Sequence, residues 1–281
     1  MIIPRCSTPN IILFGETGHG KSSVVNLLAF PKDKLAAVSD SANGVTFQNQ
    51  CYVRQIDDNN VHIFDTVGLG EATYGTVSNE SAIQQLYTLM RSLATGVDLL
   101  VFVIRGPRIT GMMQQNYKVF YEIFCQKKVP IMLVITHMEH MDDNEQKAWL
   151  GTNKPLICKK GMEFEDYICV TGLRSSHEPF RGRYDRSRIL LQVALKERLK
   201  QSGGPWIPPY ASAGYWFSTT LNGLLSHCGT TLQRLGLTLG KQGRSCVYKA
   251  LLVAGFGEEE ALKRAKEIWS VVEGGKGSRD R

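Results

Sequence analysis

The sequence predicts a three-layer α/β domain built on a mostly parallel six-stranded sheet. Short apolar runs rich in Val, Ile and Phe alternate with helical stretches, an order typical of parallel sheets that are covered on both faces. The composition DDNN between two of these runs predicts a turn, and therefore an antiparallel hairpin at one edge of the sheet. A glycine-rich segment, GETGHGKS, joins the first apolar run to the first helical stretch. These three observations favour one large α/β domain.

The strands are expected where the apolar runs lie, at Ile11–Phe14, Cys51–Ile56, Val61–Asp65, Leu99–Ile104, Ile131–Ile135 and Tyr167–Val170. Between them the spacing predicts helices at Lys21–Ala29, Ser81–Leu93, Gln114–Cys125, Asn144–Leu150 and Arg186–Lys200. Composition changes at QSGGPWIPPY (201–210), where Gly and Pro are dense. We therefore expect a domain over residues 8–200 and a C-terminal, mainly helical extension over 201–281, with helices at Cys246–Val253 and Glu258–Val272.

Composition is that of an ordinary globular protein, with 43% hydrophobic and 21% charged residues among 281. Seven cysteines lie without CxxC or CxxH spacing, which indicates reduced thiols rather than a disulfide framework or a cysteine metal cluster. No apolar run approaches the roughly 18 residues that span a bilayer, and the first ten residues do not resemble a signal peptide. A cytoplasmic protein is expected.

The net charge of +7 is concentrated in residues 151–200, and RGRYDRSR (181–188) is its densest part. Nucleic acid or an anionic membrane could in principle bind there. We interpret the stretch as a solvated surface loop leading into a helix, since no aromatic-rich RNA-binding signature accompanies it. No nucleic acid partner is expected, and peripheral membrane contact is not indicated.

The segment GETGHGKS fits the pattern GxxxxGK[ST] of a phosphate-binding loop, the P-loop. Glycines let the backbone amides turn toward one point, and the following helix adds partial positive charge there. Lys21 would reach the β and γ phosphates, and the Ser22 hydroxyl would bind Mg²⁺. The alternative, a glycine turn with a surface lysine, is hard to reconcile with a position between a strand and a helix. The expected nucleotide-binding residues of this loop are Gly15, Glu16, Thr17, Gly18, His19, Gly20, Lys21, Ser22 and Ser23.

Two later segments complete a predicted triphosphate site. FDTVGLG ends a strand at Asp65 and continues to Gly68; the aspartate could hold Mg²⁺ through a water, and the glycine amide could contact the γ-phosphate. Thr46 precedes the hairpin and could give Mg²⁺ a second hydroxyl when its loop closes over the nucleotide. Alternatively, Thr46 is only a β-branched residue leading into a strand, and DxxG only a turn.

The segment VITHMEH (134–140) follows a buried strand at the place where guanine-binding domains carry a base-selecting carboxylate. Such a carboxylate accepts hydrogen bonds from the ring N–H and the exocyclic amine of guanine, which adenine cannot offer together. Glu139 fits this role and His137 could lie against the purine, whereas Asp142 is the nearest alternative carboxylate. A polar loop that only caps the strand is the other interpretation.

In combination, GETGHGKSS, Thr46, DTVGLGE, GPRIT and THMEH resemble the immunity-associated GTPases of the GIMAP or avirulence-induced type, in the septin-like branch. The resemblance covers roughly residues 8–200. It implies a G domain that binds GTP and GDP with Mg²⁺, and a T[RH]x[DE] turn in place of NKxD, matched here by Thr136, His137 and Glu139. It also places Thr171 and Gly172, in CVTGL, in the last base-contacting loop.

The resemblance also bears on hydrolysis. Leu69 stands where small signalling GTPases have a water-orienting glutamine, so hydrolysis by a monomer should be slow. The family compensates by nucleotide-dependent dimerisation across the nucleotide face, where an arginine approaches the partner's nucleotide. Arg108 in GPRIT stands in that place, although a proline precedes it and a plain surface arginine is the alternative. Lys21, Thr46 and Arg108 are thus the expected catalytic residues, and Ser22, Thr46 and Asp65 the metal-binding ones.

Three functions therefore stand open. The first is a Mg²⁺-dependent GTP-binding protein that hydrolyses GTP slowly and switches its oligomeric state, with a homodimer through the nucleotide face as the expected assembly. The second is an ATP-using P-loop enzyme, for which no second substrate pocket or lid arginine cluster is evident. The third is a scaffold that binds GTP without hydrolysing it, an interpretation that Leu69 keeps open.

Overall fold

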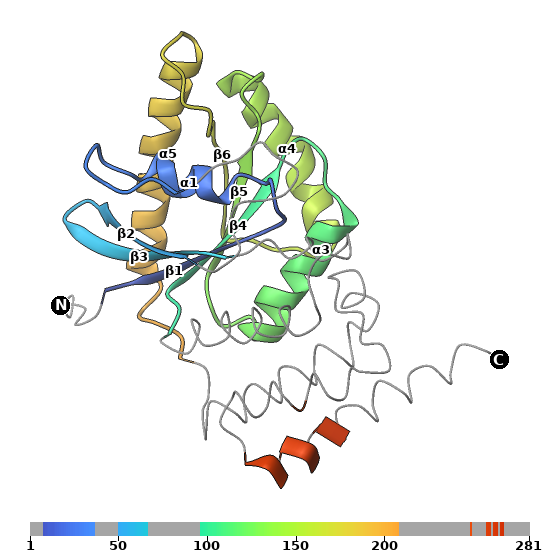
Figure 1. Cartoon of the computed structure of the whole chain (residues 1–281). Coiled ribbons are helices and arrows are strands. Elements are labelled where there is room, and N and C mark those ends of the chain that lie inside the picture. The colour runs from blue at the N-terminus through green and yellow to red at the C-terminus, as the bar shows by residue number, and fades with distance from the viewer. Residues whose placement is uncertain are drawn as a thin grey trace. The chain divides into compact units, whose positions relative to one another are not determined.

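The computed structural model describes residues 8–36, 50–66 and 96–207, with short helical fragments beyond them at 248, 258–259, 261–263 and 265–266. Residues 8–36, 50–66 and 96–206 belong to one compact unit, which carries the whole sheet (Figure 1). The predicted helices Ser81–Leu93 and Cys246–Val253 lie wholly or almost wholly outside the described residues, and Glu258–Val272 lies partly outside them. The boundary between domain and extension at residue 200 stays a prediction.

Six strands form one sheet in the order β2-β3-β1-β4-β5-β6. All neighbouring pairs are parallel except β2 and β3, which form the antiparallel hairpin at the edge. The strands are β1 (Asn10–Phe14), β2 (Gln50–Ile56), β3 (Asn59–Asp65), β4 (Leu99–Arg105), β5 (Ile131–Thr136) and β6 (Asp166–Cys169). The predicted fold class is confirmed, and each predicted strand agrees with the observed one to within two residues.

Both faces of the sheet are buried, which explains why its central strands are continuously apolar. Helices α1 (Lys21–Leu27) and α5 (Phe180–Gln201) cover one face; α3 (Gly111–Tyr117), the π-helical turn η2 (Lys118–Phe124) and α4 (Asp143–Lys159) cover the other (Figure 1). The core under α1 and α5 is aliphatic and includes Leu13 and Val101. On the opposite face the Phe14 ring stacks on Phe102 and Phe120, with centroids 4.7 and 4.5 Å apart.

Two helices are longer than the sequence predicted. Helix α4 continues nine residues beyond Leu150 and contains Pro155. A proline in a helix removes one backbone hydrogen bond, but the preceding turn is supported by side chains: Thr152 Oγ1 donates to the Ala148 carbonyl at 3.1 Å and Asn153 Nδ2 to the Trp149 carbonyl at 2.9 Å. The prediction that the helix ends at Leu150 is therefore wrong.

Helix α5 begins at Phe180, six residues before the predicted start, so the basic stretch 181–188 is helical and not a surface loop. Its first turn is held by Glu178, whose carboxylate accepts a hydrogen bond from the Gly182 N–H at 3.3 Å. This side chain supplies an acceptor for one of the unpaired N–H groups of the first turn. The sequence-based expectation overlooked this start because Gly182 weakens the helical pattern.

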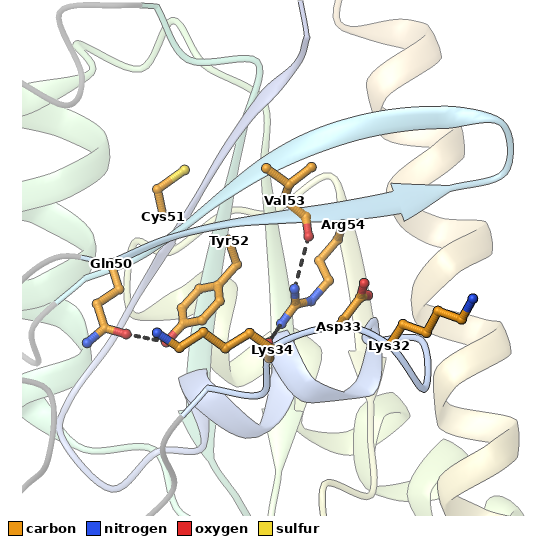
Figure 2. Close-up of a pocket in the computed structure, with 8 residues that line it drawn as sticks. All are labelled: Lys32, Asp33, Lys34, Gln50, Cys51, Tyr52, Val53 and Arg54. Atoms are coloured by element: carbon orange, nitrogen blue, oxygen red, sulfur yellow. Dashed lines mark hydrogen bonds between the residues drawn. The ribbon is translucent and has the colours of Figure 1, made fainter.

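Arg54 joins the edge strand to the rest of the domain. Its side chain is buried at 3% exposure, and its guanidinium donates to the carbonyls of Val25 (3.3 Å), Val53 (2.9 Å) and Lys34 (2.8 Å). Figure 2 shows Arg54 between β2 and the loop at Lys32–Lys34. One side chain thus connects α1, the following loop and β2.

We predict that Arg54→Ala lowers the free energy of unfolding by about 2 kcal/mol, because it leaves partly buried carbonyl oxygens without a donor. Urea denaturation followed by circular dichroism measures the change. Gln55→Ala, at the next and exposed position of β2, is the matched control and should shift stability by less than about 0.5 kcal/mol. Equal stability of the two variants would contradict the role given to Arg54.

Candidate functional site

The P-loop lies at the carboxyl end of β1, pressed against the neighbouring strands. Gly15 has φ +146° and runs so close to β4 that a Cβ atom there would lie 2.1 Å from the Val103 carbonyl oxygen. Gly20 has φ +86°, and a Cβ there would lie 3.2 Å from the Thr136 side chain. Gly15 therefore requires glycine for space, and Gly20 favours glycine because of its left-handed backbone and the crowding against Thr136. The loop geometry expected of GETGHGKS is present.

Lys21, the first residue of α1, folds back over this loop. Its side chain is buried, and Nζ donates to the carbonyls of Gly15 at 3.1 Å and Glu16 at 3.0 Å. The ammonium group is thus held at the mouth of the loop, beside the N-terminus of α1. A positive charge at a helix N-terminus is stabilised by an anion, and phosphate oxygens are suited to this position.

Ser22 and Asp65 form the candidate metal position. Ser22 Oγ donates to Asp65 Oδ2 at 2.7 Å, which connects α1 to the end of β3. Burial raises the pKa of Asp65, while the Ser22 hydrogen bond and the Lys21 charge act in the opposite direction. Asp65 Oδ1 is buried and has no hydrogen-bond partner.

These groups fit Mg²⁺, which binds one or two protein oxygens and completes its shell with phosphate oxygens and waters. A hydroxyl beside a carboxylate with an unused oxygen is such a set. Among the described residues no group of three or more His, Cys, Asp and Glu side chains could hold a metal by itself. Thr46 and Gly68, the other predicted contributors, lie outside the described residues.

The turn after β5 is joined to the P-loop through Thr136. This residue is buried, and its Oγ1 lies 2.7 Å from the His19 carbonyl oxygen and 3.1 Å from that of Ile104. His137 follows with φ +60°, and its Nδ1 is 2.9 Å from Thr136 Oγ1. The structure therefore brings Thr136 and His137 next to the P-loop, as a shared phosphate and base site requires.

Glu139 and Asp142 have different surroundings. Asp142 caps α4: its Oδ1 accepts from the N–H groups of Asn144 (2.8 Å) and Glu145 (2.9 Å), and Glu145 bonds back to the Asp142 N–H at 2.7 Å. Glu139 is half-buried, and no described group forms a hydrogen bond with its carboxylate. The capping box thus occupies Asp142 and favours Glu139 as the carboxylate that is available to a ligand.

Thr171 and Gly172 lie in the turn after β6. The Thr171 N–H donates to Ser187 Oγ at 2.8 Å, and a Cβ at Gly172 would lie 3.0 Å from the Ser23 Cβ. This turn therefore lies directly against α1, near the P-loop. Thr171 and Gly172 thus lie at the same edge of the sheet as the P-loop.

Arg108 is exposed, in the segment that follows β4. Thr110, two residues later, donates from Oγ1 to Glu16 Oε1 of the P-loop at 3.3 Å. The segment with Arg108 is thus tied to the P-loop by a side chain that the sequence analysis did not select, although it ends the quoted GPRIT box. Burial raises the pKa of Glu16, and the Thr110 hydrogen bond opposes this shift.

A cavity of about 460 Å³ lies elsewhere, along the outer strand β2. Figure 2 shows its lining side chains, which come from β2 and from the loop after α1. Arg54 faces this cavity but is bound to backbone carbonyls, so it serves the fold. None of the residues assigned to the predicted site lines this cavity.

The family model described as AIG1 family matches residues 9–177. Immune-associated nucleotide-binding protein 7 of Arabidopsis thaliana is 24% identical over 174 residues, which cover 60% of this chain and 54% of that protein. The chain thus aligns with about half the length of this relative. A solved structure from work on the chloroplast translocon components atToc33 and psToc159, whose dimerisation is important for their GTPase activity, is 18% identical with a TM-score of 0.52. It covers 72% of this chain and 86% of that one, and it shows a shared fold.

No helix within the described ranges is long and apolar enough to cross a membrane.

His19 makes the stability of the fold depend on pH. Its side chain is 12% exposed, and burial together with the Lys21 charge lowers its pKa from 6.5 to about 4. Below pH 6.5 the unfolded chain binds a proton that the folded chain does not bind until about pH 4, so acidification destabilises the fold across this window. We predict that His19→Gln removes about 2 kcal/mol of the stability loss between pH 7 and pH 5.

Urea denaturation of the ligand-free protein at both pH values measures this difference. His177→Gln, which replaces an exposed histidine, is the control and should keep the wild-type pH dependence. A His19→Gln variant that loses as much stability as wild type would exclude His19 as the source.

Proposed function

We propose, starting from the fact that this chain belongs to the AIG1 family, that it binds GTP and GDP with Mg²⁺, hydrolyses GTP slowly and forms a nucleotide-dependent dimer. The proposed P-loop, base-turn and metal-binding groups that fall within the described residues lie at the carboxyl ends of the strands. The observation that carries the proposal is the contact of Thr136 Oγ1 with the His19 carbonyl at 2.7 Å. It joins the turn that would select the base to the loop that would hold the phosphates.

Phosphate binding is assigned to the P-loop and Lys21. The Lys21 ammonium would exchange its contacts with the Gly15 and Glu16 carbonyls for phosphate oxygens, and the loop amides would add further donors. When bound, Mg²⁺ would neutralise phosphate charge next to Ser22 and Asp65. Catalysis in this class is largely positional and electrostatic, so these residues hold the triphosphate in place as charge shifts.

Base selection is assigned to Glu139. No described residue forms a hydrogen bond with its carboxylate. Glu139 lies two residues after His137, whose ring is paired with Thr136. Two donors on guanine, the ring N–H and the exocyclic amine, match the two oxygens of a carboxylate. An adenine ring lacks this pair, which favours GTP over ATP as the ligand.

Slow hydrolysis and dimerisation are the finer parts of the proposal. Leu69 has no polar group to orient water, so a second molecule is expected to complete the site. Arg108 is exposed and lies on the segment that Thr110 ties to the P-loop, a position open to a partner. The importance of dimerisation for GTPase activity in the chloroplast translocon components, which share this fold, supports the idea.

We predict that Glu139→Ala weakens GDP binding by about 100-fold, since two charge-assisted hydrogen bonds are lost, and leaves ADP binding unchanged. Titration with fluorescent GDP, and competition with ADP, measure both affinities. Asp142→Ala is the matched comparison: it should lower stability by about 1 kcal/mol through loss of the helix cap while keeping the preference for guanine.

The opposite pattern, in which only Asp142→Ala removes the preference, would transfer base selection to Asp142. Comparable affinity of the wild type for GDP and ADP would refute guanine selection altogether.

We also predict that GTP turnover per molecule rises with protein concentration, because the active form is a dimer. Arg108→Ala should lower turnover at high concentration at least about 10-fold, within the effect of arginines that act in trans. Arg181→Ala, at an exposed site on α5, is the control. Phosphate release is measured alongside size-exclusion chromatography with GDP and with a non-hydrolysable GTP analogue.

Turnover that stays negligible at every concentration would favour the scaffold that binds GTP without hydrolysing it. Turnover that is appreciable but independent of concentration would contradict the dimer mechanism.

A further inference from the structure

The first turns of α5 hold both ends of the turn that contains Glu139. Arg183 Nη1 donates to the main-chain carbonyl of Glu139. Three residues later on the same face, Arg186 forms an ion pair with Asp143, the first residue of α4. Two arginines of one helix thus bind the segment Glu139–Asp143 at its beginning and its end.

The same part of α5 also reaches the other loops of the site. Ser187 Oγ accepts the hydrogen bond from the Thr171 N–H at 2.8 Å, and the Tyr184 hydroxyl lies 3.3 Å from the Asn26 carbonyl of α1. Ser187 is buried, so this contact is shielded from water. Arg183–Ser187 therefore connects the turn after β5, the turn after β6 and the P-loop helix.

The type of contact made by Arg183 is important. A guanidinium remains charged at any ordinary pH, and its hydrogen bonds are stronger than those of neutral donors. Arg183 binds the backbone oxygen of Glu139, and no ion pair with the Glu139 carboxylate is formed. The main chain is fixed while the carboxylate stays available to a ligand.

We propose that Arg183 is a positioning residue for base selection, which holds the main chain of Glu139 so that its carboxylate meets the guanine edge. The Arg186–Asp143 pair is exposed and serves as the secondary anchor at the far end of the turn. This inference rests on the proposed function, because it assigns a role within the same base site. Preorganisation of this kind raises affinity without a direct contact to the ligand.

The test compares GDP with IDP, whose hypoxanthine base lacks the exocyclic amine of guanine. Wild type should prefer GDP by about 10-fold or more, since one hydrogen bond to a charged group is missing with IDP. Arg183→Met keeps most of the aliphatic volume but removes the donor, and should bring the ratio of affinities to within about 2-fold of one. Arg183→Lys, which retains a charged donor, should restore most of the preference.

Two controls make the ratio specific. Arg181 is exposed and lies two residues before Arg183 on α5, and Arg181→Ala should keep the wild-type ratio. In a Glu139→Ala background, Arg183→Met should cause no further loss of GDP affinity, because Arg183 acts through Glu139. Far-UV circular dichroism establishes that each variant is folded, and Arg183→Leu, which also lacks a donor, takes the place of Arg183→Met if that variant is not.

The outcomes separate this inference from the proposed function. A wild-type preference for GDP that Glu139→Ala abolishes and Arg183→Met leaves intact overturns the role of Arg183 alone. A further loss of GDP affinity in the double variant also overturns it, because Arg183 would then act independently of Glu139. A wild type that binds GDP and IDP equally refutes guanine selection, and the inference with it.

Discussion

The close approach of the P-loop to strands β4 and β5 is the constraint on which the rest of the site depends. Gly15 leaves no room for a side chain beside the Val103 carbonyl, and Gly20 lies against Thr136. Because the loop is confined there, the His19 carbonyl reaches Thr136 Oγ1 and the Lys21 ammonium reaches the loop carbonyls. A residue with a Cβ at Gly15 would displace the loop and separate it from the turn after β5.

The sheet is apolar on both faces, so the polar groups of the site are confined to the carboxyl ends of its strands. Burial there disfavours the charged forms of two side chains, because it raises the pKa of Asp65 and lowers that of His19. Arg54, on the edge strand β2, is also buried, and burial lowers its pKa as well, but its guanidinium donates to three backbone carbonyls. These bonds serve the fold, whereas Asp65 Oδ1 and His19 Nδ1 are buried without a hydrogen-bond partner.

The strands and the P-loop could be predicted because local pattern determines them: apolar runs mark β1, β4 and β5, and glycines at fixed spacing mark the loop. The ends of α4 and α5 could not be, since they depend on individual side chains such as Glu178, which binds the Gly182 N–H. The sequence favoured Glu139 over Asp142, two carboxylates three residues apart. The capping hydrogen bonds of Asp142, which support the same preference, became visible only in the structure.

The basic stretch 181–188 shows how a charge pattern changes meaning once it is placed in a fold. As a loop its arginines would all face water and form a surface for polyanions. As a helix it directs Arg183 to the Glu139 carbonyl, Arg186 to Asp143 and Arg188 to the ring of Phe30, 5.0 Å from its centroid. Three of the four arginines are thus engaged within the domain. Arg183 and Arg186 connect α5 to the turn between β5 and α4.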